Sequence, residues 1–331
     1  MEPLRSRDSR KPPKPYTIRM RLHPLLVLTL LVSNASAQIA QPVSTLVAQP
    51  ALQGFTLEGN TLSNGSATLT LERKGDLLKA ATVKLAASDT VQMGKLLNAL
   101  TGYDFAEPLV GFLKQNNAPL EAATAAKPLN VNAEEYTLSF YKQKDILNLN
   151  VALTQIPESV FRKVNLIKGK VDAPIVIRVY SDFQCPYCQK LEGEFLMAYA
   201  RKLPRDVRLE FHHVPLEQIH PNARPSAEAS ECAAEQKKFW EYHEALFVDR
   251  SWMSLKDPSG IFNELAKKVK LNTRQFSACF SSRKYKSVVD AALEAAGRLG
   301  IRGTPTVYVG GYKLGNAYDP AAYERLYKLL R

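Results

Sequence analysis

Two cysteines separated by two residues follow directly on an apolar segment, and this pair constrains the fold more than any other feature of the chain. Cys185 and Cys188 enclose Pro186 and Tyr187, and residues 175–180 before them are apolar and β-branched, which predicts a buried strand. Apolar side chains then recur at helical spacing after Cys188. A strand that leads into a C-x-x-C pair at the start of a helix is typical of a thiol–disulfide redox centre.

The position of the pair at a helix start has a chemical consequence. The first sulfur, of Cys185, would face unpaired N–H groups and the positive end of the helix dipole, and both favour the thiolate. Pro186 suits the first turn, where a missing N–H costs nothing. These arguments predict Cys185 as the nucleophile and Cys188 as the resolving partner. Taken alone, the pair is also compatible with half of a zinc site or with two buried apolar thiols.

A second signal lies more than a hundred residues later, in the segment Gly303–Val309. There Thr304 and Pro305 lead into a β-branched and aromatic run. Proline is tolerated at the start of a strand, and the bond before a proline is the one that can be cis. We therefore expect a strand that begins after Pro305.

Three segments together resemble the DsbA-like family of extracytoplasmic thiol:disulfide oxidoreductases. They are residues 180–188, residues 232–240 and residues 303–309, in the order that this family has, and the resemblance covers about residues 160–331. It implies an α/β thioredoxin-like fold with an inserted helical lobe at about 218–298. It also implies disulfide formation in exported proteins, with a cis-Pro305 opposite the C-x-x-C and the backbone of Thr304 holding the substrate.

Two departures leave the direction of the redox reaction open. Many DsbA-like proteins carry a buried Glu six residues before the first cysteine, where this chain has Val179, so a buried proton carrier is either absent or supplied elsewhere. The Pro-Tyr dipeptide with Thr304 before the proline also resembles the DsbC/DsbG-like isomerases and reductases, which have a separate N-terminal dimerisation domain. A soft-metal binding protein or metallochaperone that uses Cys185 and Cys188 as ligands is an alternative from another class.

The remaining two cysteines, Cys232 and Cys279, lie in segments predicted to be helical. Relatives in the DsbA-like family often carry cysteines at these places as a structural pair, so the resemblance implies a structural disulfide. Such a bridge would close a loop of about 48 residues and contribute at most roughly 4 kcal/mol. Free buried thiols and a second redox relay are the alternatives.

Residues 1–37 have the layout of a secretory signal peptide: a basic head, the apolar run 25–32, and Ala-Ser-Ala before Gln38. The apolar run is too short for a stable membrane span, although an uncleaved anchor is the alternative. Met20 gives a more ordinary signal peptide, which would leave residues 1–19 as a mis-assigned start. The expected location is extracytoplasmic, in the bacterial periplasm or cell envelope.

Charge and motifs exclude several function classes. The formal net charge is +12, and the leader contributes +5 of it because seven basic residues outnumber Glu2 and Asp8. The remaining Lys and Arg residues are scattered and form no basic block with aromatics, which argues against nucleic-acid binding. No cofactor motif is present, so we expect no cofactor. The expected partners are cysteine-containing exported proteins and a redox partner that resets Cys185 and Cys188.

The sequence of the N-terminal half predicts a separate small α+β domain at residues 51–156, which follows a loose linker at 38–50. Three short strands are expected in 52–86, with a hairpin turn at Asn64-Gly65, then helices at 90–101 and 105–116, a loop at 118–129, and a closing hairpin at 135–141 and 146–153. This domain contains neither cysteine nor histidine. We interpret it as a packing or positioning domain, with dimerisation as the functional alternative.

A second linker is predicted at 157–170, followed by the redox domain at 171–331. Its elements are expected as strand 174–180, helix 186–202, strand 207–214, helices across 223–295, strands 306–309 and 312–314, and helix 320–331. His212 and His213 fall on opposite faces of a strand, so one should be exposed and one half-buried, and a catalytic role is the minor alternative. The aromatic cluster at 239–247 is predicted to be core of the helical lobe.

Overall fold

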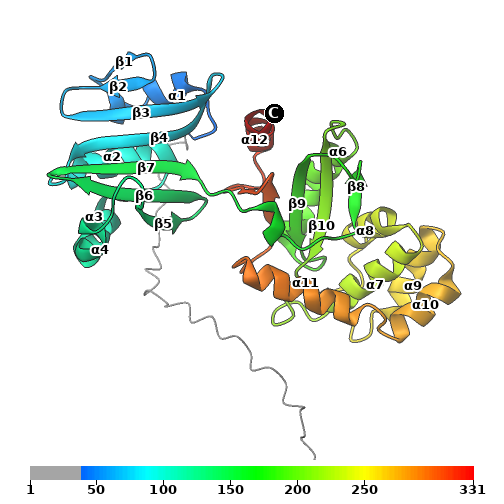
Figure 1. Cartoon of the computed structure of the whole chain (residues 1–331). Coiled ribbons are helices and arrows are strands. Elements are labelled where there is room, and N and C mark those ends of the chain that lie inside the picture. The colour runs from blue at the N-terminus through cyan, green and yellow to red at the C-terminus, as the bar shows by residue number, and fades with distance from the viewer. Residues whose placement is uncertain (1–38) are drawn as a thin grey trace, which may run out of the picture.

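The computed structural model describes residues 39–331, so the signal-peptide prediction for residues 1–37 lies outside the described residues. Two sheets organise the chain, one of seven strands and one of five. Figure 1 shows them side by side, joined by the segment that leaves β7 (Ile146–Leu153). This arrangement is the expected small α+β domain followed by an α/β domain.

The N-terminal sheet is antiparallel throughout and has the strand order β1-β2-β3-β4-β7-β6-β5. The predicted turn at Asn64-Gly65 is confirmed between β2 and β3: Asn64 Oδ1 accepts hydrogen bonds from two N–H groups of the turn, and Gly65 has a φ of 86°. Four strands, not the expected three, fill residues 52–86, because Gly59 turns the chain between β1 and β2. The remaining bounds are β1 Thr56–Glu58, β2 Thr61–Ser63, β3 Ala67–Lys74, β4 Leu77–Ala86, β5 Leu129–Ala133 and β6 Tyr136–Gln143.

Helices pack against this sheet through their apolar faces. α2 (Thr90–Thr101) and α3 (Ala106–Gln115) confirm the two predicted helices, and Leu96, Leu97 and Leu100 of α2 are fully buried in the core of this domain. The predicted loop at 118–129 is wrong at both ends. It contains α4 (Asn117–Glu121), which buries Leu120, and the first residue of β5.

The predicted linker at 38–50 is wrong over its described part. α1 (Val43–Val47) and the short helix η1 (Pro50–Leu52) occupy this segment, and Val43 and Leu46 are buried. The backbone is also paired, because the Ala40 N–H donates to Leu78 O at 2.7 Å and the Leu78 N–H donates to Gln41 O at 2.8 Å. The segment is therefore part of the N-terminal domain.

The second sheet has the order β12-β11-β9-β10-β8. β9 and β10 are parallel, while β8, β11 and β12 run antiparallel to their neighbours. The predicted strands are confirmed, with bounds β9 Ile175–Ser181, β10 Val207–His213, β11 Thr306–Val309 and β12 Tyr312–Lys313. The linker predicted at 157–170 is partly wrong: it contains the turn η2 (Glu158–Val160), the buried Phe161, and β8 (Ile167–Gly169), which pairs with β10.

Helices surround this sheet and form the inserted lobe (Figure 1). The predicted helix at 186–202 begins at Pro186 as expected, but it is interrupted by a π-helical segment, η3 (Glu192–Leu196), and ends at Ala200, before the predicted end. The lobe helices fall within the predicted insertion. The bounds are α5 Pro186–Leu191, α6 Met197–Ala200, α7 Ala223–Glu235, α8 Phe239–Val248, α9 Ser259–Lys268, α10 Thr273–Ser281, α11 Lys286–Arg298 and α12 Pro320–Leu330.

The two histidines of β10 do not divide between surface and core as expected. His212 and His213 are each 3% exposed, because β10 is an inner strand with structure packed on both faces. His212 stacks on Tyr180 at a ring distance of 4.5 Å. The aromatic cluster of α8 is core, as predicted, since Phe239, His243 and Phe247 are almost fully buried.

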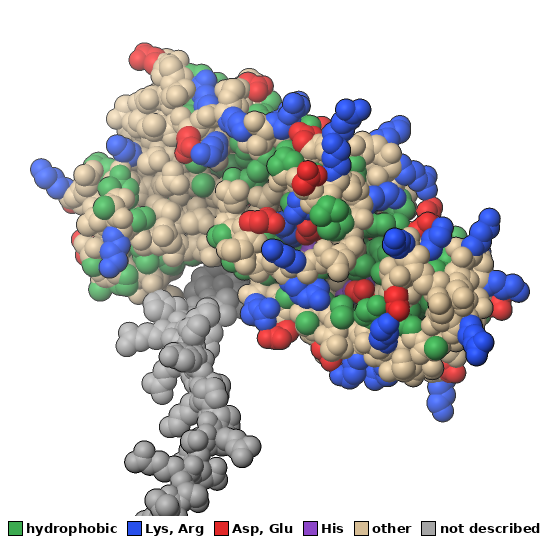
Figure 2. Space-filling model, turned by 45° about the vertical axis from the view of Figure 1, so that its right-hand side comes forward, with side chains coloured by type: hydrophobic (Ala, Val, Ile, Leu, Met, Phe, Trp, Pro, Cys, Tyr) green, Lys and Arg blue, Asp and Glu red, His purple; other side chains and the backbone are tan. Residues whose placement is uncertain are grey.

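The surface shows no segregation of charge on the face drawn in Figure 2, where Lys and Arg side chains are interspersed with Asp and Glu. Among residues 39–331, no helix is both long and apolar enough to cross a membrane.

Candidate redox site

Strand β9 leads to the two cysteines Cys185 and Cys188 at the start of α5. Cys185 is the N-cap residue, with extended backbone (φ −68°, ψ 126°), and Pro186 occupies the first helical position. Cys185 is 3% exposed and Cys188 is fully buried, whereas Tyr187 between them is 65% exposed. Both cysteines are free thiols in this structure.

The chain brings Thr304 and Pro305 against this pair. The Thr304–Pro305 peptide bond is cis, and the strand that follows pairs with β9, so that Thr306 lies opposite Tyr180. This register places the Thr304 carbonyl oxygen 3.5 Å from Cys185 Sγ, which donates to it. Four residues that the sequence predicted as one site therefore lie together, although 119 positions separate Cys185 from Thr304.

The two sulfurs have opposite electrostatic environments. A hydrogen bond from the Cys188 thiol is the largest of the effects that lower the pKa of Cys185 to about 5, against the opposing effect of burial. The backbone N–H groups of Cys188 and Tyr187, at the first turn of α5, act in the same direction, as does the contact with Thr304. Burial raises the pKa of Cys188, and the neighbouring Cys185 raises it further. Near neutral pH the reduced pair therefore holds a Cys185 thiolate beside a protonated Cys188.

The helical lobe fixes the backbone just before the cysteines through residues that the sequence analysis missed. Arg250 donates from Nη1 to the Phe183 carbonyl at 3.1 Å and from Nη2 to the Gln184 carbonyl at 2.8 Å. Burial lowers the pKa of Arg250, and the nearby charge of Cys185 partly offsets this effect. Arg250 thus holds the loop and places a positive charge near the thiolate. It follows α8 in a loop without a motif, so only the fold could reveal its role.

A second set of hydrogen bonds joins the same loop to the lobe. The side chain of Gln184 accepts from the Asn222 N–H at 2.8 Å and donates to the Met253 carbonyl at 3.1 Å. Asn222 in turn donates from Nδ2 to the carbonyls of Trp252, Met253 and Leu255. Because these groups are buried, each bond removes a polar atom that would otherwise be unsatisfied.

Asp182, at the end of β9, connects the loop before the cysteines to the segment that enters the lobe. Its carboxylate is buried and accepts from the Gln184 N–H at 2.7 Å, from the Leu216 N–H at 2.9 Å and from His220 Nδ1 at 2.7 Å. The Asp182 N–H lies 3.5 Å from Cys188 Sγ and donates to it. One residue thereby connects the buried sulfur, the end of β9 and the segment that enters the lobe.

The position of the buried acid differs from the DsbA-like pattern, as the sequence indicated. Val179 of β9 is buried in the apolar core. A buried carboxylate is found instead at Glu192, in the helix that begins at Pro186; it lies four residues after Cys188 and therefore on the same helical face. Glu192 Oε1 lies 3.3 Å from Nε2 of His243, which is also fully buried. The His243 ring also packs edge-on against Phe183, at a ring distance of 5.5 Å.

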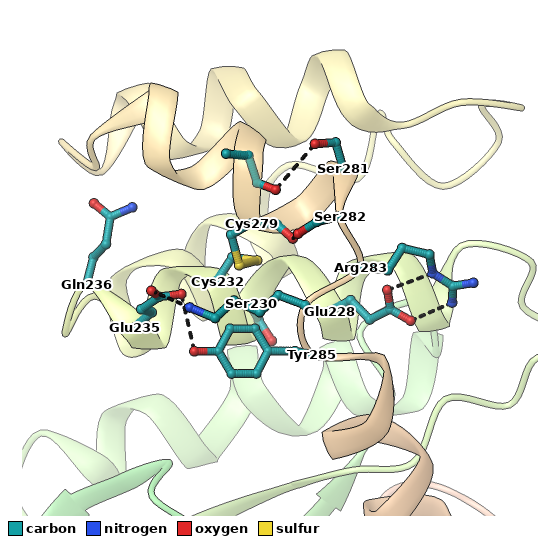
Figure 3. Close-up of a disulfide and its surroundings, with 12 residues drawn as sticks. Glu228, Ser230, Cys232, Glu235, Gln236, Cys279, Ser281, Ser282, Arg283 and Tyr285 are labelled. Atoms are coloured by element: carbon teal, nitrogen blue, oxygen red, sulfur yellow. Dashed lines mark hydrogen bonds and ion pairs between the residues drawn. A yellow bond between two sulfur atoms is a disulfide. The ribbon is translucent and has the colours of Figure 1, made fainter.

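Cys232 and Cys279 form a disulfide between α7 and α10 (Figure 3). Ion pairs flank it, since Glu228 binds Arg283 with both carboxylate oxygens and Glu235 binds Lys284 at 2.7 Å. The bridge joins two helices of the lobe, and its cysteines belong to the same apolar cluster as Cys185 and Cys188.

A family model described as thioredoxin matches residues 162–329, which is half of the chain and includes every residue of the site. The chain belongs to the thioredoxin family. In this chain the β9–α5 junction carries the thiol pair, and the cis-proline loop lies against it.

Curated relatives contain this part as a fraction of a longer protein. The Na(+)/H(+) antiporter NhaA 3 of Salinispora tropica is 31% identical over 156 residues, which are 46% of this chain and 22% of that protein. The Na(+)/H(+) antiporter NhaA 1 of Mycolicibacterium vanbaalenii is 33% identical over 162 residues, 48% of this chain and 25% of that protein. This chain thus spans a quarter or less of the length of these relatives.

Matches to solved structures cover about half of the chain. BdbD from Bacillus subtilis, in its oxidised form, has 22% identity and a TM-score of 0.45, and the match covers 53% of this chain and 94% of that chain. DsbA from Chlamydia trachomatis has 21% identity and a TM-score of 0.46, with 54% and 96% covered.

Proposed function

We propose that this protein is a DsbA-like thiol:disulfide oxidoreductase that forms disulfides in cysteine-containing exported proteins. The observation that carries the proposal is the environment of Cys185: a nearly buried thiol with a pKa of about 5, at a helix N-terminus and 3.5 Å from the carbonyl of Thr304 before the cis-proline. A stabilised thiolate is a good leaving group, which makes the corresponding disulfide oxidising.

In the oxidising direction the reaction starts from the Cys185–Cys188 disulfide. A substrate thiolate attacks Cys185 Sγ, the bond to Cys188 breaks, and a mixed disulfide between substrate and Cys185 forms. The second substrate thiolate then attacks the substrate sulfur and expels Cys185 as a thiolate. Two electrons pass from substrate to enzyme. Of the two substrate protons, Cys188 takes one and the solvent takes the other, since the pKa of Cys188 is raised and that of Cys185 is lowered.

The proposed setting is the bacterial periplasm or cell envelope, with export directed by the leader in residues 1–37. The disulfide between Cys232 and Cys279 supports this setting, because structural disulfides persist in oxidising compartments. A separate redox partner of the cell would reoxidise Cys185 and Cys188 after each cycle.

Trapping of mixed disulfides tests the assignment of roles. A Cys188→Ser variant should accumulate covalent complexes with an unfolded protein that contains disulfides: the Cys185 thiolate attacks a substrate disulfide, one substrate thiolate leaves, and the mixed disulfide persists because Cys188 is missing. These complexes should disappear on reduction. A Cys185→Ser variant should trap none. Trapping by Cys185→Ser alone would refute the assignment, and stoichiometric copper or zinc binding without any exchange would support the metallochaperone alternative instead.

A DsbC/DsbG-like isomerase or reductase is the second candidate, favoured by the Pro186-Tyr187 dipeptide, by Thr304 and by the additional N-terminal domain. Alkylation with a mass tag after acid quench of intact cells separates the two. If Cys185 and Cys188 are blocked as a disulfide, the resting enzyme is an oxidant. If both carry tags, the resting enzyme is reduced, and the second candidate replaces the first.

A further inference from the structure

The N-terminal domain is docked on the redox domain by main-chain as well as apolar contacts. The Ile156 N–H donates to the Gly311 carbonyl at 2.9 Å, and Gln155 Nε2 donates to the Gly310 carbonyl at 3.2 Å. Leu77 of β4 is buried in the same apolar cluster as Leu314 of the redox domain. The two domains therefore share a core at this point.

At the tip of the β5–β6 hairpin, Glu135 of the N-terminal domain lies against Gly315 of the redox domain. A Cβ atom on Gly315 would lie 2.5 Å from Oε1 of Glu135, so the Glu135 carboxylate lies directly against the Gly315 backbone. Glu135 is itself held, because its Oε2 accepts from the Tyr103 hydroxyl at 3.0 Å. The next residue toward β5, Glu134, has a φ of 53° and is exposed.

A cleft of about 880 Å³ lies between this hairpin tip and the cis-proline loop, within the size range of about 300–1,000 Å³ that is common for ligand sites. One wall is formed by Asn132, Glu134 and Glu135 of the N-terminal domain, and the other by the loop from Leu299 to Thr306. Further residues of the redox domain, among them Leu314 and Tyr318, complete it.

We infer that this cleft binds an extended segment of the substrate polypeptide next to its reacting cysteine, and that the N-terminal domain is a substrate-recognition domain. The inference rests on the proposed function. Any polypeptide joined to Cys185 Sγ must pass the Thr304 carbonyl, which lies 3.5 Å from that sulfur. Thr304 and Pro305 line the cleft, so the residues that flank the substrate cysteine on this side enter it.

The chemistry of the walls fits an unfolded chain better than a small apolar ligand. Exposed Glu134 stands on one wall and exposed Arg302 on the other, while Ile156, Ile301 and Tyr318 offer partly exposed apolar surface. Opposite charges on facing walls can contact side chains of either sign, and the apolar groups cover the segment between them. A small thiol such as dithiothreitol needs none of these contacts.

Matched variants in the hairpin test the inference. Asn132→Trp fills the cleft from one wall, and its control is Asn130→Trp, on the same strand and face but outside the cleft. Glu134→Lys reverses a charge in the cleft, and its control is Lys144→Glu, which has the same φ of 53° in the turn at the other end of β6.

The measurement is the ratio of two second-order rate constants for reduction of the Cys185–Cys188 disulfide, one with a reduced, unfolded protein and one with dithiothreitol. Asn132→Trp should lower this ratio about tenfold relative to wild type, and Asn130→Trp should not. Glu134→Lys should change the ratio for a basic substrate protein in the opposite direction from an acidic one, unlike Lys144→Glu.

Each outcome has a distinct meaning. Equal ratios for Asn132→Trp and Asn130→Trp would overturn the inference. So would a wild-type dimer in light scattering that Asn132→Trp converts to monomer, because a second copy would then occupy the cleft. If the wild-type disulfide reacts with neither thiol, the proposed function fails rather than the cleft. Thermal unfolding of each variant identifies one that has lost its fold.

Discussion

Removal of the Cys188 thiol should raise the pKa of Cys185, because the hydrogen bond from that thiol is the largest of the effects that lower it. In the wild type, the lowered value of about 5 stands against an ordinary value of 9.0. In Cys188→Ala the N–H groups of α5 and the contact with Thr304 remain, so the pKa should settle between these two values. Cys188→Ser retains a donor and should stay closer to the wild type.

The free energy by which the folded protein stabilises the Cys185 thiolate follows from the same two pKa values. At pH 7, two decades above a pKa of about 5, the folded protein favours the Cys185 thiolate by about 3 kcal/mol relative to an ordinary thiol. This contribution to the reduced state is largest above the ordinary pKa and is lost as the pH falls through about 5. It corresponds to roughly a hundredfold in the exchange equilibrium, or about 60 mV toward a more oxidising couple.

Thiolate absorbance at 240 nm, titrated from acid to alkaline pH with the oxidised protein as blank, measures these pKa values directly. Cys185→Ala should lack the acidic transition and is the control for assignment. The equilibrium with glutathione at pH 7 checks the predicted oxidising shift in the wild type. A wild-type transition near 9, or a Cys188→Ala transition that coincides with that of the wild type, would refute the reasoning.

Four further predictions concern stability and the loop before the cysteines. Cys232→Ser should destabilise the protein by at most about 4 kcal/mol in urea unfolding, since the lost bridge spans 47 residues of sequence. Arg250→Ala should raise the pKa of the nucleophile and slow exchange, whereas Arg250→Lys, which keeps the charge, should affect the pKa less. An unchanged pKa in Arg250→Ala would show that its charge is unimportant. Glu210→Gln should destabilise the protein in urea unfolding, because Arg178 Nε lies 3.0 Å from Glu210 and is almost fully buried. The loss should be smaller than the roughly 3–5 kcal/mol of a buried charge left without a partner, since Glu158 still pairs with Arg178. Burial also lowers the pKa of His212, and an unfolded chain would protonate this residue first on acidification, so stability should fall from pH 7.5 to pH 5 in wild type and less in His212→Phe.

Local patterns predicted the redox elements well because their signals are contained in short stretches. The strand before Cys185, the helix after it and the strand after Pro305 each have a clear hydrophobic period and a defined start signal. The same is true of the turn at Asn64-Gly65. These features depend only on residues close together in the sequence, so they could be predicted from this sequence alone.

Contacts between distant segments could not be predicted in this way. Arg250 lies in a loop, and only the folded lobe brings it to the two carbonyls before Cys185. His212 and His213 are both buried because distant segments pack on the two faces of β10: His212 stacks on Tyr180, and His213 lies against Phe239 of the lobe. The segment 39–50 has the composition of a linker, yet its few apolar side chains complete a core formed elsewhere.

The arrangement of the site separates the chemistry of the thiol pair from the recognition of its substrate. The groups that act most strongly on the pKa of Cys185 come from α5 itself and from Thr304, and the lobe positions the loop through Arg250. Near the site, the N-terminal domain lines the cleft beside the cis-proline loop, through the tip of the β5–β6 hairpin. Variants in that hairpin should therefore leave the absorbance titration of Cys185 unchanged while they alter the preference for polypeptide over small thiols. A shift of that titration in Asn132→Trp would show that the two functions are coupled through Thr304.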